Sequence, residues 1–413
     1  MPTIVLIGTL DTKGVEYDFI RKQIKKAGCD VIVIDAGVLG AAQIKPTVTR
    51  QQVAQAAGAD VAALAQAGDR GGAVMTMAKG AAQITAQLFA EGRLDGVMGM
   101  GGSGNSSIVA AAMQALPIGV PKLIVSTLAS GDTRPYVGAT DVTMMYSVVD
   151  IAGINRVSER ILSNAAAAIA GMAHSYAGRS RRARHKPLIG ATMFGVTTPC
   201  VNIAREWLEK QGYEVLVFHA TGTGGRSMEA LVKGGFLAGV LDITTTELAD
   251  ELVGGVLSAG PDRLEAAGAQ GIPQVVSLGA LDMVNFGPID SVPDRFKGRN
   301  LYQHNATVTL MRTTPPENTQ LGAMIARKLN AGKGPATVFI PRKGVSMIDV
   351  TGKPFYDAQA DAALFDALTA NLASNVKVKS LDTDINDPKF ALAMAKEMHR
   401  LILTAGSSRA SSR

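Results

Sequence analysis

Cysteine is nearly absent from this sequence. The chain contains only Cys29 and Cys200, which cannot form the disulfide framework of a small secreted protein. Its first residues lack the charged segment followed by an apolar segment that marks a secretory signal. The longest apolar runs are also much shorter than a membrane span requires. These absences predict a cytoplasmic protein without a membrane segment.

Aromatic residues and net charge are low as well. Aromatic residues make up 5% of the chain and hydrophobic residues 47%, so the cores must consist mainly of Ala, Val, Ile, Leu and Met. The net charge is +6, but five of the basic residues fall in one run at 179–186, and without them the charge is +1. Nucleic-acid binding needs basic residues spread over a face with aromatic or groove-reading partners. The sequence therefore predicts no nucleic-acid partner.

What the chain does contain is the same opening pattern twice. Residues 3–14, TIVLIGTLDTKG, are an apolar run that ends in a turn rich in Gly and Thr, and a helical pattern and a second apolar run follow. Residues 188–198, LIGATMFGVTT, repeat this order. With 413 residues the chain is long enough for two domains. We expect an α/β fold with two lobes, each a largely parallel sheet flanked by helices.

The alternation of apolar runs and helical patterns continues through both lobes. In the first lobe, strands are expected at 3–8, 30–35, 72–77, 94–99, 122–126 and 140–145. In the second lobe, strands are expected at 188–192, 214–218, 236–243, 274–278, 306–310 and 336–340, followed by a hairpin at 345–355 and a helix at 387–404.

The basic run marks the boundary between the lobes. Runs of like charge are usually solvated linkers. We therefore expect an N-terminal nucleotide-binding lobe at 1–178, a basic linker at 179–187, a C-terminal lobe at 188–405 and a disordered tail at 406–413. An Ala-rich helix at 152–176 closes the first lobe. Its small side chains allow close helix contact and predict a homodimer or larger homo-oligomer, although the helix could equally be buried within its own lobe.

The strongest candidate for a ligand site is the loop GMGGSGNSS, which lies between an expected strand and an expected helix. Its glycines would let the backbone approach a ligand, while amide and hydroxyl groups face an anion at the positive end of the helix. The loop also matches the GxGxxG dinucleotide fingerprint, but no acidic residue ends the next strand to hold a ribose. The pattern favours phosphate binding over a nicotinamide cofactor or a structural turn. The candidate residues are Gly101, Gly102, Ser103, Gly104, Asn105, Ser106 and Ser107.

Three polar segments at the ends of other expected strands complete the predicted nucleotide site. In the first, Lys13 can neutralise a phosphate, and Asp11 or the Thr12 hydroxyl can reach Mg²⁺; Asp11 and Thr12 could instead cap the following helix. Asp35 ends the second strand, where it can accept hydrogen bonds from ribose hydroxyls or cap the loop. A further loop offers hydroxyls and a second possible metal ligand in Asp132; its residues are Ser130, Gly131, Asp132 and Thr133.

The second lobe contributes three candidate catalytic residues. His219 follows an expected strand and is a plausible acid or base, because small perturbations place the pKa of histidine near neutrality. Asp242 also lies on the presumed ligand edge. Arg312 is suited to bidentate recognition of a carboxylate or phosphate. If the two lobes face each other, the terminal phosphate of ATP would point toward these three residues; back-to-back lobes would have independent sites.

Six loops together resemble a known family. GTLDTKG, GMGGSGNSS, STLASGDT, HATGTGGRSMEAL, QHNATVTLMRTT and FIPRKGVSMID are similar to segments of the ATP-binding family named after the tomato mosaic virus resistance protein. The resemblance covers nearly the whole chain. It implies two Rossmann-like lobes, ATP and Mg²⁺ held mainly by the first lobe, and self-association. It also implies a possible partner, a separate barrel protein that resembles phosphoenolpyruvate-utilising enzymes. The nucleotide contacts that it implies are Asp11, Thr12, Lys13, Gly101, Gly102, Gly104 and Ser106.

From these observations we expect an Mg-ATP-binding protein that acts as an enzyme on a small carboxylate or sugar-acid metabolite. Phosphoryl transfer needs chiefly positioning and charge neutralisation, which Lys13, Mg²⁺ and Arg312 could provide. One alternative is a nucleotide-sensing module that acts through a partner protein. A lesser alternative is an NAD-dependent dehydrogenase that uses the GMGGSG loop.

Overall fold

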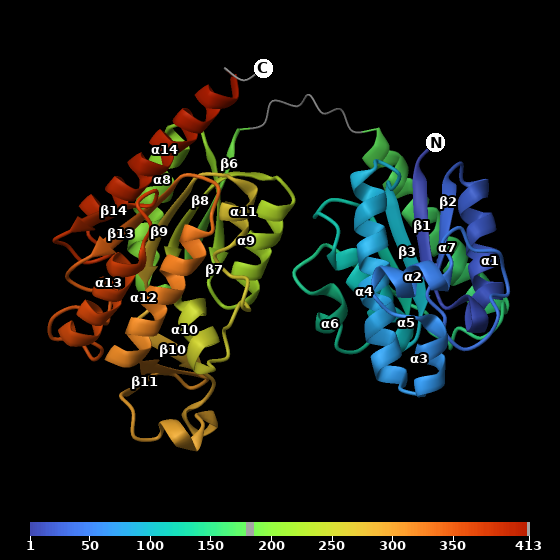
Figure 1. The fold of residues 1–413 in the computed structure, drawn as a ribbon, viewed down its shortest axis with the longest axis horizontal. Helices are drawn as coiled ribbons and strands as arrows, with labels where there is room; N and C mark the ends of the chain where they lie inside the picture. Colours follow the sequence, from blue (N-terminus) through green and yellow to red (C-terminus); the bar gives the residue numbers. More distant parts are fainter. Residues whose placement is uncertain (179–185, 411–413) are drawn as a thin grey trace. The chain divides into compact units, whose positions relative to one another are not determined.

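The computed structural model describes residues 1–178 and 186–410, and side chains through residue 405. The chain divides into two compact units between residues 183 and 184 (Figure 1). Residues 179–185 of the predicted linker and residues 411–413 of the predicted tail lie outside the described residues. In this part of the chain, no helix combines the length and apolar character needed to cross a membrane.

The N-terminal unit is built on a five-stranded parallel sheet with the order β2-β1-β3-β4-β5. Its strands are β1 (Thr3–Gly8), β2 (Asp30–Asp35), β3 (Gly96–Gly101), β4 (Lys122–Ser126) and β5 (Thr143–Tyr146). Its helices are α1 (Leu10–Lys26), α2 (Arg50–Ala56), α3 (Val61–Ala67), α4 (Arg70–Ala90), α5 (Ser103–Gln114), α6 (Arg134–Val137) and α7 (Arg156–Ala177).

Both faces of this sheet are buried, which explains why β1 is a continuous apolar run instead of an alternating one. Ile4 and Leu6 pack in a core with α1 and α7, whereas Val5 and Ile7 pack in a second core with α4 and α5 (Figure 1). The apolar face of α7 is therefore occupied inside its own unit. Self-association through this helix stays a prediction.

The C-terminal unit contains a six-stranded parallel sheet with the order β14-β13-β9-β8-β6-β7 and a smaller antiparallel sheet with the order β10-β12-β11. The parallel strands are β6 (Leu188–Met193), β7 (Glu214–His219), β8 (Leu237–Thr244), β9 (Gln274–Gly279), β13 (Ala336–Pro341) and β14 (Lys377–Leu381). The antiparallel strands are β10 (Met283–Phe286), β11 (Leu301–Asn305) and β12 (Val308–Arg312).

Helices cover both faces of the larger sheet here as well. Phe339 of β13 packs with α8 and α14, while its neighbours Val338 and Ile340 pack with α10, α12 and α13. The α-helices are α8 (Thr198–Lys210), α9 (Thr223–Lys233), α10 (Thr246–Val253), α11 (Ala266–Gln270), α12 (Pro315–Asn330), α13 (Ala358–Asn371) and α14 (Pro388–Ala410). Short 3₁₀ helices occupy Gly195–Thr197, Ile289–Ser291 and Asp294–Phe296.

The predicted fold class, two α/β lobes with largely parallel sheets, is confirmed. Two element predictions are wrong. The strand expected at 72–77 lies inside α4, because its apolar residues belong to a helical stripe that includes Ala73, Met77 and Ala81. The hairpin expected at 345–355 consists of turns. The C-terminal helix also continues to Ala410, beyond the predicted start of the tail.

Candidate functional site

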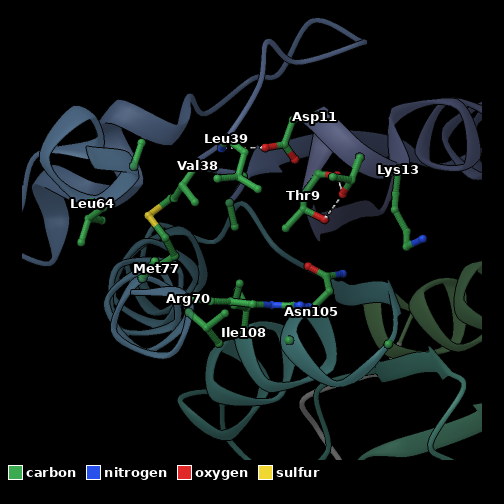
Figure 2. Close-up of a pocket in the computed structure, with 18 of the residues that line it drawn as sticks. Thr9, Asp11, Lys13, Val38, Leu39, Leu64, Arg70, Met77, Asn105 and Ile108 are labelled. Atoms are coloured by element: carbon green, nitrogen blue, oxygen red, sulfur yellow. Dashed lines mark hydrogen bonds between the residues drawn. The ribbon is translucent and has the colours of Figure 1, made fainter. Parts of the chain in front are cut away.

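A cavity of about 650 Å³ opens at the carboxyl ends of β1, β2 and β3 (Figure 2). The chain runs from β1 to the neighbouring β2 on one side, and then to β3 on the other side of β1. The strand order thus reverses between β1 and β3, which is where open parallel sheets usually bind ligands. The loops that follow β1 and β3 both line the cavity.

The loop after β3 brings backbone into the cavity. Gly101 has φ +154, and a Cβ atom there would lie 2.8 Å from the Asn105 Cβ, so glycine is required. Gly102 and Gly104 line the cavity, and added Cβ atoms there would make only ordinary contacts. No side chain of the described residues caps the start of α5, at Ser103. The N–H groups of its first turn are thus available to an anion.

Three other polar residues of this loop form hydrogen bonds within the protein, whereas Ser103 is exposed and lines the cavity. The Asn105 Nδ2 donates to the Tyr17 hydroxyl at 2.9 Å, although Asn105 also borders the cavity. Ser106 Oγ lies 2.8 Å from Ser126 Oγ in the buried interior, and Ser107 Oγ donates to the Ser103 carbonyl at 2.9 Å. The structure therefore places the backbone of residues 102–104, and not the two serine hydroxyls, at the cavity wall.

In the loop after β1, Thr9, Asp11, Thr12 and Lys13 line the cavity. The Lys13 ammonium group donates to the Ile151 carbonyl, so it is already partnered. In Figure 2 the Lys13 side chain lies on the far side of Thr9 from the apolar wall described below. Lys13 also has non-helical backbone angles, φ −131 and ψ 21, within the first turn of α1.

The two predicted acidic residues at this edge are tied into the protein. Asp35 is 1% exposed, and its Oδ2 accepts a hydrogen bond from Arg50 Nε at 2.8 Å, with Arg50 Nη2 in ion-pair contact at 2.7 Å. Asp11 Oδ2 accepts from the backbone N–H groups of Leu39 at 3.0 Å and Gly40 at 3.2 Å. Both carboxylates therefore hold the loop that follows β2. Asp11 lines the cavity, but Asp35 lies behind it.

The cavity also contains charged residues that the sequence interpretation missed. Arg70, at the start of α4, lies beside the N-terminus of α5, and its Nη2 is 3.9 Å from the position of a Cβ on Gly104 (Figure 2). No described residue forms a hydrogen bond or ion pair with the Arg70 side chain. Asp150 is exposed and lines the cavity near Lys13. Asp69 caps α4 by accepting from the Gly72 N–H at 3.0 Å.

One wall of the cavity is apolar. Leu39 of the loop after β2, Leu64 of α3 and Met77 of α4 lie on the same side of the cavity (Figure 2). The full apolar wall consists of Val38, Leu39, Leu64, Val74, Met77 and Ile108. An apolar wall that adjoins a helix N-terminus and a guanidinium group suits a ligand with a flat apolar part and an anionic part.

The predicted loop Ser130–Thr133 is not part of this cavity in the described structure. Asp132 instead binds the Arg134 guanidinium through both carboxylate oxygens, at 2.9 and 2.8 Å. These hydrogen bonds lower the pKa of the exposed Asp132 carboxyl to about 2. Asp132 and Asp11 are therefore not brought together by the cavity.

The three predicted catalytic residues have different surroundings in the C-terminal unit. His219 is exposed at the end of β7, where its ring lies 5.4 Å from that of Phe194. Asp242 is fully buried and accepts two hydrogen bonds from Arg263, at 2.5 and 2.7 Å. Arg312 belongs to the smaller sheet and donates to Asp361 at 2.7 Å. Among the described residues, no hydrogen bond or ion pair joins these three side chains, and their catalytic role stays a prediction.

The chain belongs to the uncharacterised protein family UPF0261. The profile of its N-terminal domain matches residues 2–178, and that of its C-terminal domain matches residues 186–402. A UPF0261 protein of Clostridium tetani is 56% identical over 96% of this chain and 98% of its own length. The tomato mosaic virus susceptible protein tm-1 of Solanum lycopersicum is 43% identical over 95% of this chain but only 55% of its own length.

Solved structures resemble the chain only weakly. UDP-N-acetylglucosamine 2-epimerase of Rickettsia bellii is 10% identical, with a TM-score of 0.25 over 98% of this chain and 96% of the epimerase. Values this low say nothing about the function of the chain.

Proposed function

We propose that the N-terminal unit binds ATP, as a complex with Mg²⁺, in the cavity at the carboxyl ends of β1 and β3. The observation that carries the proposal is the uncapped start of α5 beside the unpaired Arg70 guanidinium, within a cavity of about 650 Å³. A helix N-terminus and an arginine both favour phosphate oxygens. The apolar wall of Leu39, Leu64 and Met77 would receive the base.

The acidic residues at the cavity fit a metal that arrives with the nucleotide. No group of three His, Cys, Asp or Glu side chains within the described ranges could hold a metal ion by itself. Mg²⁺ is usually held by phosphate oxygens, waters and one or two carboxylates. Asp150 presents an exposed carboxylate at the cavity wall, one oxygen of which accepts from the Ile151 N–H at 2.8 Å, whereas Asp11 Oδ2 accepts from two backbone N–H groups. We therefore assign Asp150 as the carboxylate that would contact Mg²⁺, in preference to Asp11 and Asp132.

The first test compares ligands by calorimetry on the full chain, with ATP, AMP and NAD titrated in parallel in the presence of Mg²⁺. ATP is expected to bind more tightly than the other two. The dehydrogenase alternative requires a carboxylate for the ribose, and Asp35 is already held by Arg50. Tighter binding of NAD than ATP would overturn the proposal, as would the absence of any nucleotide binding.

Substitution of Arg70 tests the site itself. Arg70→Ala is expected to weaken ATP binding about 10- to 100-fold, because hydrogen bonds to charged groups contribute roughly 1.5–3 kcal/mol. AMP binding should weaken less if Arg70 contacts the distal phosphates. Lys13→Ala should also affect ATP more than AMP, but by a smaller factor, because Lys13 is bound to the Ile151 carbonyl.

Arg93→Ala is the matched control, because Arg93 is an exposed arginine of the same unit that does not line the cavity. It should leave both affinities unchanged. Equal losses of ATP binding in the Arg70 and Arg93 variants would place the nucleotide elsewhere.

We further propose that the bound ATP serves an enzymatic reaction on a small carboxylate or sugar acid. A turnover assay distinguishes this from a nucleotide sensor: ATP consumption is measured alone and with a panel of hydroxy acids. Stimulation by one acid supports the enzyme. Binding of ATP without consumption, whichever acid is present, would favour the sensor that acts through a partner protein.

A further inference from the structure

A second cavity, of about 550 Å³, lies entirely within the C-terminal unit, at the carboxyl end of β13. Arg342 and Lys343 follow β13 directly and line it, together with Thr351 and Tyr356 of the next loop and Asp361 of α13. Phe365 forms part of its wall. Neither the sequence interpretation nor the family description assigns a role to this place.

The cationic side chains of Arg342 and Lys343 line this cavity, and they have different interaction partners. The Arg342 guanidinium lies 6.0 Å from the centre of the Phe365 ring, and no hydrogen bond or ion pair holds it among the described residues. Lys343 Nζ lies 2.8 Å from Asp382 Oδ2, but the two side chains are 60% and 82% exposed. Such exposed pairs are weak. Both cations are thus available to an anion.

A buried group of charges borders the same cavity. Asp361 accepts from Arg312 Nη2 at 2.7 Å, and Arg312 Nη2 also donates to Asp349 at 3.1 Å. Asp282 contributes a third carboxyl group, which accepts from the Ser346 hydroxyl at 2.7 Å. Burial raises the pKa of Asp349, and the charges of Asp282 and Asp361 add to this rise.

Asp361 connects this buried group of charges to the cavity. Asp361 accepts a hydrogen bond from Arg312, which also donates to Asp349, and its residue is 7% exposed at the cavity wall. Asp384 is a second carboxylate in the lining. The cavity therefore offers anion-binding groups at Arg342 and Lys343 and carboxylate oxygens, among them those of Asp361, that can accept a hydrogen bond from a hydroxyl group.

We propose that this cavity binds a small hydroxy acid, with the acid's carboxylate at Arg342 and Lys343 and a hydroxyl group at Asp361. The site would be independent of nucleotide, because all of its lining residues belong to the C-terminal unit. Tyr356, which is 47% exposed, and Thr351 supply further hydroxyl groups for a polyhydroxy acid. The ligand class is thus the one with an anionic end and at least one hydroxyl on a short carbon chain.

The test is calorimetry on the full chain without nucleotide, with glycerate, gluconate, propionate and alanine as probes. Glycerate or gluconate should bind, and propionate, which lacks the hydroxyl, should bind about ten-fold more weakly or worse. Alanine tests the alternative that the cavity binds an amino acid, which carries a carboxylate and an ammonium group in place of the hydroxyl. Tighter binding of alanine than of glycerate would overturn the proposal, as would binding of none of the four.

Substitutions locate the ligand. Arg342→Gln should weaken the binding of the hydroxy acid about ten-fold or more. Arg295→Gln is the matched control, because Arg295 is an exposed arginine of the same unit that lies 4.7 Å from the Phe296 ring centre but lines no described cavity. It should leave the affinity unchanged. Equal affinities in the Arg342 and Arg295 variants would overturn the assignment of this cavity.

Asp361→Asn tests the hydroxyl acceptor. It should reduce the preference for glycerate over propionate, whereas Arg342→Gln should weaken both acids alike. ATP is titrated into the same variants, and its affinity should not change. A variant that loses the hydroxy acid but keeps ATP separates this proposal from nucleotide binding, and a preference for glycerate that survives Asp361→Asn would contradict the role of Asp361.

Discussion

The two units have the same strand order around their first strand, yet the carboxyl edges of their sheets differ. In the N-terminal unit β1 lies between β2 and β3, and in the C-terminal unit β6 lies between β7 and β8. The helices that follow β3 and β8 are α5 and α10, and the second residue of these helices is Gly104 in one and Glu247 in the other. The carboxyl edge of the N-terminal sheet is open at this point, whereas that of the C-terminal sheet contains the Glu247 carboxylate.

In the C-terminal unit the Glu247 side chain, from the helix after β8, binds the backbone at the start of α9. Its carboxylate accepts from the N–H groups of Gly222 at 2.7 Å and Gly225 at 3.0 Å, at the start of α9, and from Arg263 Nε at 2.7 Å. A Cβ atom on Gly225 would lie 2.1 Å from a Glu247 oxygen. The Gly-rich segment after β7 is thus shaped for an internal carboxylate.

A shared topology therefore does not imply a shared ligand site. At the C-terminal switch point, Asp242 and Glu247 neutralise Arg263, whose side chain is fully buried. The cavity of this unit lies instead at β13, two strands away from β8 in the sheet. In the N-terminal unit the cavity lies at the switch point itself, beside the uncapped start of α5.

The largest expected effect comes from removing the internal anion. Glu247→Ala should lower the free energy of unfolding of the C-terminal unit by about 3–5 kcal/mol, because it leaves a buried guanidinium short of one partner. Trp207 is the only tryptophan of the sequence and lies in α8, so its fluorescence during chemical denaturation reports on this unit.

Glu209→Ala provides the control, because Glu209 is half-exposed and, among the described residues, forms an ion pair only with Arg205, at 3.9 Å. It should change the stability by less than about 1 kcal/mol. If Glu247→Ala were as mild as Glu209→Ala, the buried network would not be what holds this edge together.

The fold could be predicted from sequence wherever a strand is buried on both faces. Runs such as TIVLIG and ATVFIP are apolar without interruption, so strands β1 and β13 were expected where they occur. The prediction failed for residues 72–77, whose apolar side chains at Ala73 and Met77 are four positions apart and belong to a 21-residue helix. A six-residue window is too short to distinguish the two periodicities.

The candidate site could be predicted only in part, because sequence identifies loops but not their partners. The GMGGSG loop was found and does line a cavity, whereas the similar TGTGG segment encloses Glu247, which is 22 positions beyond Gly225. Arg70 was missed because it begins the helix that was taken for a strand. Arg342 and Lys343 follow a correctly expected strand, so the rule applied to the other loops could have found them.

A second prediction introduces a carboxylate into the N-terminal unit, at the position where the C-terminal unit has Glu247. Gly104→Glu places in α5 the residue that α10 has at the same position, and a Cβ there would lie 3.6 Å from Val74, an ordinary contact. The variant should fold and should lose ATP affinity about 10- to 100-fold, because its charge occupies the anion site near Arg70. Calorimetry measures the affinity, and far-UV circular dichroism measures the fold.

Two controls separate charge from bulk. Gly104→Gln has the same size without the charge and should lose less affinity than Gly104→Glu. Gly171→Glu adds the same charge on α7, where a Cβ would meet nothing within 4 Å, and should bind ATP normally. A Gly104→Glu protein that binds ATP like the unaltered chain would show that this helix start is not the phosphate site.

The smallest expected effect concerns pH, and it follows from the buried acids of the C-terminal unit. Burial raises the pKa of Asp250 from 3.8 to about 7, although the hydrogen bonds that it accepts from Asn285 act to lower this pKa. Between these values the folded unit binds a proton that the unfolded chain has released. Stability is therefore greatest at low pH within this window and falls as the pH rises toward 7.

From about pH 5 to pH 7 this group should lower the free energy of unfolding by roughly 2 kcal/mol, measured by Trp207 fluorescence in denaturant. Other buried acids whose pKa values burial also raises add to the same slope; they are Asp282, Asp349, Asp361 and Glu229. Glu397 has the opposite sign, because Arg400 lowers its pKa from 4.5 to about 2, so its stabilisation is lost only below this window. Asp250→Asn should flatten the profile, and substitution of the exposed Asp262 by Asn should not. A profile that rises with pH across the window would contradict the direction assigned to Asp250.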